Sequence, residues 1–244
     1  MEHFGIQSLR GAAPRREAFT LVELLVVMAI LGILFVLSAA AVPRALMAGQ
    51  RAACTSNMRQ IGQATLLYAA DHRGRLPPTR HSAAADEAWI FLLSPYLGNV
   101  DEVRISPADP QRAERLRRRA TSYILNDVVA DPLLDPFGEP LPGGYGRLSL
   151  IEEPGSTIVA VVISDNRGPG AANDHTHTRT WGSFNNFLSD VEPDRHRLGS
   201  RHPNRTEGSA PYLYLDGSVR IFDANFIREV FARGDNIGMP GYAP

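Results

Sequence analysis

An uninterrupted apolar stretch dominates the N-terminal part of the chain. After Glu23 no charged residue occurs until Arg44, and Leu24 to Val42 comprises 19 residues. A helix needs roughly 20 residues, at about 1.5 Å each, to cross the hydrocarbon core of a bilayer. The pattern therefore predicts a membrane-spanning helix. A lone Glu at its start is costly in apolar surroundings unless its carboxylate finds a partner.

The helical pattern continues beyond this stretch. One face carries residues at spacings of seven, four, three, four and three, which is α-helical periodicity. These residues are Met47, Cys54, Met58, Ile61, Thr65 and Tyr68. Arg51 interrupts the stripe, Pro43 is expected to kink the helix, and the Gly and Pro residues of 73–78 end it. We expect a helix from Thr20 to about Ala70 whose second half packs against a sheet.

The remaining residues predict short strands and helices separated by loops. Strands are expected at 103–110, where the strand runs into a turn, at 121–126, and at 157–164 as a central strand. A hairpin with an Asp-Gly turn is expected at 212–222. Short helices are expected at 86–97 and 226–232, the first with Trp89, Leu92, Leu93 and Tyr96 on one side.

Two stretches are interpreted as loops, namely 131–146, which is rich in Pro and Gly, and 165–201, a long polar excursion. The predicted fold class is α+β, with a long N-terminal transmembrane helix packed on a C-terminal antiparallel sheet. The head that carries the sheet is expected to be rich in loops.

Composition and charge exclude several classes of function. The formal net charge is −1, so no overall charge attracts nucleic acid or an anionic membrane. The single cysteine, Cys54, excludes an intrachain disulfide. A basic cluster comprises Arg112, Arg115, Arg117, Arg118 and Arg119. It lacks the interleaved aromatic residues on which single-stranded bases stack, so we interpret it as a solvated face and do not expect nucleic acid as a partner.

The residues before the apolar helix point to a processed precursor. A short basic leader, Met1 to Ala18, precedes Phe19-Thr20-Leu21-Val22-Glu23 and the apolar stretch. This arrangement closely resembles the N-terminus of type IV prepilins and type II secretion pseudopilins. The family usually has Gly before the cut, where this chain has Ala18. One alternative is an ordinary signal anchor. A secretory signal peptide has an apolar region of only about 7–15 residues, which is shorter than the one found here.

The resemblance implies a defined course of processing and assembly. Prepilin peptidase would cut between Ala18 and Phe19 and N-methylate Phe19. Glu23 would then neutralise the new α-amine of Phe19, on the same or a neighbouring subunit, inside a filament. The implied partners are prepilin peptidase, other pilin or pseudopilin subunits and an inner-membrane assembly platform. The implied topology is single-pass in the inner membrane, with the N-terminus cytoplasmic and the head periplasmic.

The implied division of the chain follows from these assignments. Residues 1–18 are the leader, 19–43 the transmembrane and assembly helix, 44–72 its extension and 73–244 the head. A second resemblance lies near the C-terminus. His202, followed by Asp216 and Gly217, resembles the prepilin-type processing-associated domain, which is defined by a His, nine residues and an Asp-Gly pair. Here thirteen residues separate His202 from Asp216.

Other polar residues of the head suggest chemistry that we weigh against structural roles. A zinc site is one interpretation of His175, His177, His196, His202, Asp174, Asp190, Asp194 and Asp216. A calcium site would use oxygen ligands from Asp165, Asn166, Asp174 and Asp216. No spacing matches a metal motif, so no cofactor is expected. His202 and Asp216 are also considered as an acid–base pair, with a turn-forming role preferred for Asp216.

The sequence therefore favours a non-enzymatic assembly subunit, a pseudopilin or minor pilin. A membrane-tethered protein that never polymerises is the alternative, its head binding a polysaccharide, a surface partner or DNA through residues 165–201. A metal-dependent hydrolase that uses the histidines is the third hypothesis.

Overall fold

The computed structural model describes residues 19–79, 89–134, 140–141, 145–170 and 173–242. The chain divides at Pro43 into two compact units, residues 1–42 and 43–244. Helix α1, Leu21–Asp71, contributes to both units and continues through Pro43. Proline has no N–H to donate, so one helical hydrogen bond is missing at this boundary. The helix predicted from Thr20 to about Ala70 is confirmed.

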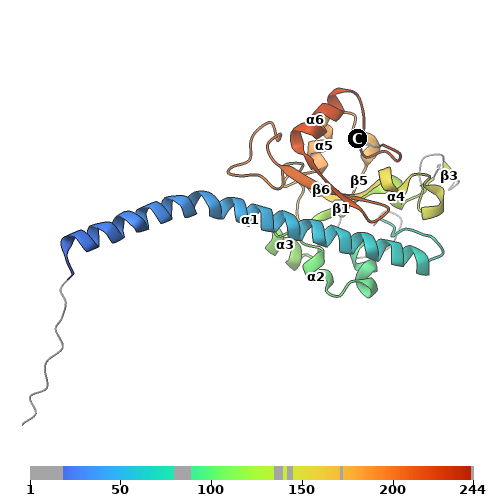
Figure 1. The fold of residues 1–244 in the computed structure, drawn as a ribbon. Helices are drawn as coiled ribbons and strands as arrows, with labels where there is room; N and C mark the ends of the chain where they lie inside the picture. Colours follow the sequence, from blue (N-terminus) through green and yellow to red (C-terminus); the bar gives the residue numbers. More distant parts are fainter. Residues whose placement is uncertain (1–18, 80–88, 135–139, 142–144, 171–172, 243–244) are drawn as a thin grey trace, which may run out of the picture. The chain divides into compact units, whose positions relative to one another are not determined.

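The second unit is built around a five-stranded sheet (Figure 1). Its strands are β1 (Tyr123–Asn126), β4 (Ile158–Val162), β5 (His175–Thr176), β6 (Ser209–Tyr214) and β7 (Val219–Asp223). The strand order is β5-β1-β4-β6-β7, so β4 is central as predicted. All neighbours are antiparallel except β5, which runs parallel to β1. The α+β arrangement is confirmed, with a mixed, mostly antiparallel sheet.

Short helices and turns connect and cover the strands. The α-helices after α1 are α2 (Val100–Val103), α3 (Arg112–Arg117), α4 (Asp127–Ala130), α5 (Phe184–Asp190) and α6 (Ala224–Ala232). The 3₁₀ segments are η1 (Trp89–Tyr96), η2 (Leu148–Leu150), η3 (Pro154–Ser156) and η4 (Thr178–Thr180). A separate ribbon pairs β2 (Leu133–Leu134) with β3 (Pro140–Leu141).

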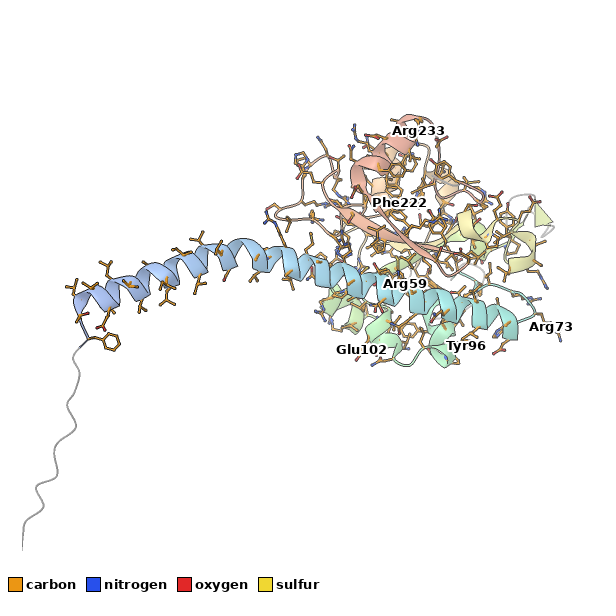
Figure 2. The ribbon with its side chains drawn as sticks, in the orientation of Figure 1. Arg59, Arg73, Tyr96, Glu102, Phe222 and Arg233 are labelled. Carbon is orange, nitrogen blue, oxygen red and sulfur yellow. The ribbon has the colours of Figure 1, made fainter. Side chains whose placement is uncertain are left out.

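Both faces of the sheet are covered. The side chains of β6 identify the helix that covers each face. Leu213 lies next to Gly62 of α1, where an added Cβ would stand only 2.8 Å from Leu213 Cδ1. Its neighbour Tyr212 contacts Phe222, whose ring stacks on Phe226 of α6 (Figure 2). Successive side chains of a strand point to opposite faces. Helix α1 therefore covers one face of the sheet and α6 the other.

The second half of α1 buries the predicted stripe. Cys54, Met58, Ile61 and Thr65 are buried, and Met47 and Tyr68 are half-buried. Gly62 belongs to the same contact, because a Cβ there would also lie 3.0 Å from the Cα of Gly217. A Cβ contact of 3.0 Å is tighter than most, and here it would be made with backbone, so glycine at position 62 allows α1 to approach the β6–β7 turn.

Segments η1 and α2 lie along another side of α1. The Tyr96 hydroxyl donates to Asp71 Oδ2 (2.8 Å), and Asn57 Nδ2 donates to the Ile105 carbonyl (3.1 Å). Figure 2 shows Tyr96 and Glu102 on this side of the helix. The α-helical stripe expected within 86–97 is wrong for the described residues. A 3₁₀ helix with Pro95 inside buries Trp89, Ile90, Phe91 and Leu93, because its three-residue turn presents different positions.

The strand expected at 103–110 is also wrong. Asn99 caps α2, its side-chain oxygen accepting from Asp101 N (3.1 Å), and turns follow Val103. Arg104 is buried, and its guanidinium donates to the carbonyls of Arg115 (3.2 Å), Leu116 (3.2 Å) and Ala120. The Val and Ile residues that suggested a strand contribute to the core from non-strand backbone.

The structure differs in detail from two further expectations, the loop at 165–201 and the hairpin at 212–222. The segment 165–201 contains β5, η4 and α5 and buries Trp181 and Phe187, so the loop interpretation is wrong for much of it. The hairpin at 212–222 is present as β6 and β7, but its loop has three residues, because Leu213 pairs with Val219 and Tyr214 N donates to the Ser218 carbonyl (2.8 Å). Gly217 occupies the left-handed position of this loop (φ 83°).

Candidate functional sites in the N-terminal motif and the head

The first turn of α1 is closed by a reciprocal pair of side chains. Thr20 N and Thr20 Oγ1 both donate to Glu23 Oε2, each at 2.8 Å. Glu23 N in turn donates to Thr20 Oγ1 (3.2 Å). This is a capping box, in which Thr at the N-cap and Glu three residues later satisfy backbone N–H groups that the helix leaves open. Glu23 therefore has a local role that the sequence reasoning did not anticipate.

The apolar residues that follow have no protein surface to bury them. Every large hydrophobic side chain from Phe19 to Val42 is exposed, Phe19 by 83%. Among the described residues, α1 is the one helix long and apolar enough to cross a membrane. Exposure on this scale costs free energy in water, about 25 cal/mol for each Å² of apolar surface. This unit therefore requires lipid or other protein around it. Ala18 and the rest of the leader lie outside the described residues.

The C-terminal motif residues do not meet. His202 is half-buried in the loop before β6, and its Nδ1 accepts from Asn204 N (3.2 Å). Asp216 lies in the turn after β6, where its Oδ1 accepts from Ser218 N (2.8 Å). A six-residue strand, about 20 Å long, lies between them. The two side chains do not form an acid–base pair, and Asp216 has the turn-forming role preferred for it.

Two of the four histidines considered as zinc ligands, His175 and His177, each pair with a carboxylate. His175 Nδ1 lies 2.7 Å from Asp174 Oδ1, and His177 Nδ1 lies 2.8 Å from Asp127 Oδ2. Their rings are edge to face with centroids 5.1 Å apart. In the part of the chain that the structure describes, no group of three or more His, Cys, Asp and Glu side chains is placed to hold a metal. The donor sets considered for zinc and for calcium therefore do not fit a metal ion.

A buried ionic network holds the loop that leads into β6. Arg205 pairs with Glu192 Oε2 (2.7 Å) and with Asp194 Oδ1 (2.9 Å), and both carboxylates are fully buried. Arg197 and Arg201 each lie 3.4 Å from Glu192 Oε1. Burial raises the pKa of Glu192 above its ordinary value, although the neighbouring guanidinium groups oppose this. Sequence reasoning missed the network. Its available signal was the close succession of two acidic residues and four arginines over 192–205.

His196 is buried next to this network. It is 3% exposed, and neither ring nitrogen has a hydrogen-bond partner among the residues that the structure describes. Burial lowers its pKa to about 4, with contributions from the positive charges of Arg195 and Arg51. The imidazole is therefore neutral at physiological pH. A neutral, buried ring of this kind packs as part of the core.

The Arg cluster of 112–119 does not form one basic surface. Arg115 is fully buried and pairs with Asp109 (2.8 Å). Arg117 and Arg118 both pair with Glu114, and Arg119 lies over the ring of Phe91 (4.3 Å to the centroid). The cluster is therefore divided between the core and the surface, because Arg115 is buried and the other four are exposed. The carboxylates of Asp109 and Glu114 pair with three of the five guanidinium groups.

Comparison with known proteins adds one finding. The family model of the prokaryotic N-terminal methylation motif matches residues 14–39. No curated protein and no solved structure matches the chain. The N-terminus therefore carries a methylation motif like that of type IV prepilins and pseudopilins. The motif implies processing by prepilin peptidase and is consistent with anchoring in the inner membrane. Proteins of this kind are generally structural subunits and not enzymes. The match does not reach His202, Asp216 and Gly217, whose resemblance stays a prediction.

Proposed function

We propose that this protein is a pseudopilin or minor pilin subunit that assembles into a type II secretion or type IV pilus-like filament. The observation that carries the proposal is the exposed apolar half of α1 with Glu23 in its first turn, inside the methylation motif. A lipid bilayer accommodates this surface before assembly, and the apolar helices of neighbouring subunits accommodate it afterwards.

Cleavage between Ala18 and Phe19 would create the partner that Glu23 needs. In the uncut chain, Thr20 engages Oε2 of Glu23 and leaves Oε1 without a hydrogen bond among the described residues. An N-methylated α-amine on Phe19 of a neighbouring subunit would pair with that oxygen. A carboxylate in a dry filament core is strongly unfavourable when unpaired, so pairing sets the axial position of one subunit against the next.

The topology follows from the same assignment. The leader would be cytoplasmic, where prepilin peptidase acts, and the head would lie in the periplasm. The inner-membrane assembly platform would extract the processed subunit from the bilayer. The head contributes no reaction in this proposal.

Processing is tested by the mass and N-terminal sequence of the protein from membranes with and without prepilin peptidase. The expected result is a chain that begins at N-methylated Phe19 only when the peptidase is present. A chain that starts at Met1 in both strains would overturn the proposal and favour the non-polymerising, membrane-tethered binding protein.

Assembly is tested by a pair of substitutions that separates the two roles of Glu23. Glu23→Gln keeps a residue that completes a capping box but removes the charge. Glu23→Ala removes both. If the charge pairs with the amine, both variants lose incorporation into filaments while processing continues. If Glu23→Gln assembles normally, the cap alone matters and the proposed pairing is wrong.

A further inference from the structure

A groove runs beside helix α5 of the head. Helix α5 lies on the same side of the sheet as α6 in Figure 1. It consists of two adjoining hollows of about 440 and 480 Å³, which share Asn185, Leu188 and Pro203 as lining residues. One wall is α5, and the other is the loop 201–206. We call this the α5 groove. Its size is in the range of ligand sites, roughly 300–1,000 Å³.

The charged side chains that line the α5 groove are all basic. Arg201 and Arg205 line the first hollow together with His202, and Arg228 lines the second. No carboxylate is among the lining residues of either hollow. The chain as a whole has a net charge of −1, so this is a local excess and does not reflect overall composition.

The ionic network behind the groove leaves part of this charge uncompensated. Glu192 and Asp194 supply two negative charges to Arg197, Arg201 and Arg205, which supply three positive charges. Arg201 is the most exposed of the three, at 31%, and one of the two with the longer 3.4 Å contact to Glu192. The excess positive charge is therefore most accessible at Arg201, inside the groove.

Arg228 provides a second positive charge at the other hollow. It is exposed, and its Nη2 donates to the neutral Asn225 Oδ1 (2.9 Å). Arg201 lines only the first hollow and Arg228 only the second, with the shared residues between them. A ligand that occupies the whole groove would therefore meet two separated cationic groups.

The other lining residues supply amides, two hydroxyl groups and apolar surfaces. Asn166, Asn185 and Asn204 are exposed and present both donors and acceptors, as sugar hydroxyl groups require. Phe184 is half-buried and, with Leu188, offers an apolar surface against which the C–H face of a pyranose ring packs. A nucleic acid instead requires several stacking rings and a longer basic track.

We propose that the α5 groove binds an acidic polysaccharide, with the carboxylates of uronate-type sugars pairing with Arg201 and Arg228. The amide side chains would hydrogen-bond the sugar hydroxyl groups, and Phe184 would support one sugar ring. This site is independent of filament assembly, because it uses only residues of the head.

The test is calorimetric titration of the full-length protein in detergent micelles with an oligogalacturonate. Its methyl-esterified form, which has the same hydroxyl groups and no charge, is the ligand control. Single-stranded DNA is the comparison polyanion. The proposal expects binding of the acid form, much weaker binding of the ester, and weaker binding of DNA. Equal binding of acid and ester, no binding of the acid, or tighter binding of DNA would each overturn it.

Variants locate the site. Arg228→Gln should weaken oligogalacturonate binding about tenfold, as expected for one lost charge-assisted hydrogen bond. Arg59→Gln is the matched control, because Arg59 is exposed on α1 and does not line the groove (Figure 2). Arg201→Gln should have a similar effect, but it also touches the buried network, so Arg228→Gln decides. An equal loss for Arg59→Gln would show non-specific charge attraction and refute the site.

Discussion

The two units of this chain differ in the side chains that they expose and bury. From Phe19 to Val42, large apolar residues are exposed along the whole helix. In the head, Glu192 and Asp194 are completely buried. A buried charge is tolerated only when its partners are close, and Arg205 provides them at 2.7 and 2.9 Å. The buried charges of the head are therefore paired within the head, whereas the apolar side chains of the N-terminal unit are covered only by lipid or other proteins.

The two halves of helix α1 show the same difference within one element. Leu31 and Leu67 are both 53% exposed, yet the first belongs to a wholly apolar segment and the second to a helix whose opposite side is buried. Exposure of a single residue does not distinguish the two halves. What distinguishes them is whether any face of the helix is covered by the same unit.

The largest expected effect is that of a truncation in the buried half. Ile61→Ala should destabilise the head by about 2–5 kcal/mol, because Ile61 is fully buried and its loss leaves a cavity. Ile30→Ala, in the exposed half, should leave the stability of the head unchanged. Trp89 and Trp181 are the two tryptophans and both lie in the head, so tryptophan fluorescence during urea unfolding in detergent reports it alone. Equal destabilisation by both variants would contradict the comparison.

The reverse dependence should appear when a charge is introduced. Leu31→Arg places a guanidinium near the middle of the apolar stretch and should cost about 2.5–3.5 kcal/mol of membrane insertion. Leu67→Arg, at the same exposure, should have no effect on membrane association. Alkaline carbonate extraction of membranes measures both. Retention of Leu31→Arg in the membrane fraction at the wild-type level would contradict the expected cost of a charge at position 31.

Acidification should weaken the head through His196. Its pKa is about 4 in the folded protein and about 6.5 when unfolded, so the unfolded state binds the proton more readily between these values. The stabilisation is complete above about pH 6.5 and decreases to a loss of about 3 kcal/mol near pH 4.

The His196→Gln variant isolates this contribution. Glu192 acts in the opposite direction, because its raised pKa favours the folded state as the pH falls. The difference in the free energy of unfolding between wild type and His196→Gln removes such shared contributions. That difference should change with pH between 6.5 and 4, and a difference independent of pH would exclude His196 as the cause.

The smallest expected effect concerns the cap. Thr20→Ala removes the N-cap oxygen and should cost about 1 kcal/mol of helix stability in the first turn of α1. Thr20→Ser, which retains the hydroxyl, is the control. Amide hydrogen exchange of residues 21–24 in micelles measures the fraying. Unchanged exchange in Thr20→Ala would show that the surrounding apolar phase, and not the capping box, holds this turn.

Much of the fold was predictable because its elements carry local periodicity. Local patterns predicted the stripe on α1, strand β4 from its β-branched residues, the β6–β7 hairpin from its Asp-Gly turn, and helix α6. The prediction failed at 103–110, where turns replace the expected strand. At 89–96 the predicted helix is present but is a 3₁₀ helix. Both segments are short and lie against α1. Arg104, for example, is buried only because three carbonyls from distant residues converge on its guanidinium.

The sequence by itself determined the apolar helix, the position of Glu23 in it and the motif that precedes it, because these depend on consecutive residues. Only the tertiary structure decided that Glu23 closes a capping box, that His202 and Asp216 lie at opposite ends of β6, and that Glu192 and Asp194 are buried against Arg205. The α5 groove also arises from four separate segments, at residues 166, 184–189, 201–206 and 228. The physical reason is that ion pairs and grooves depend on distances across the fold, which no local pattern of residues encodes.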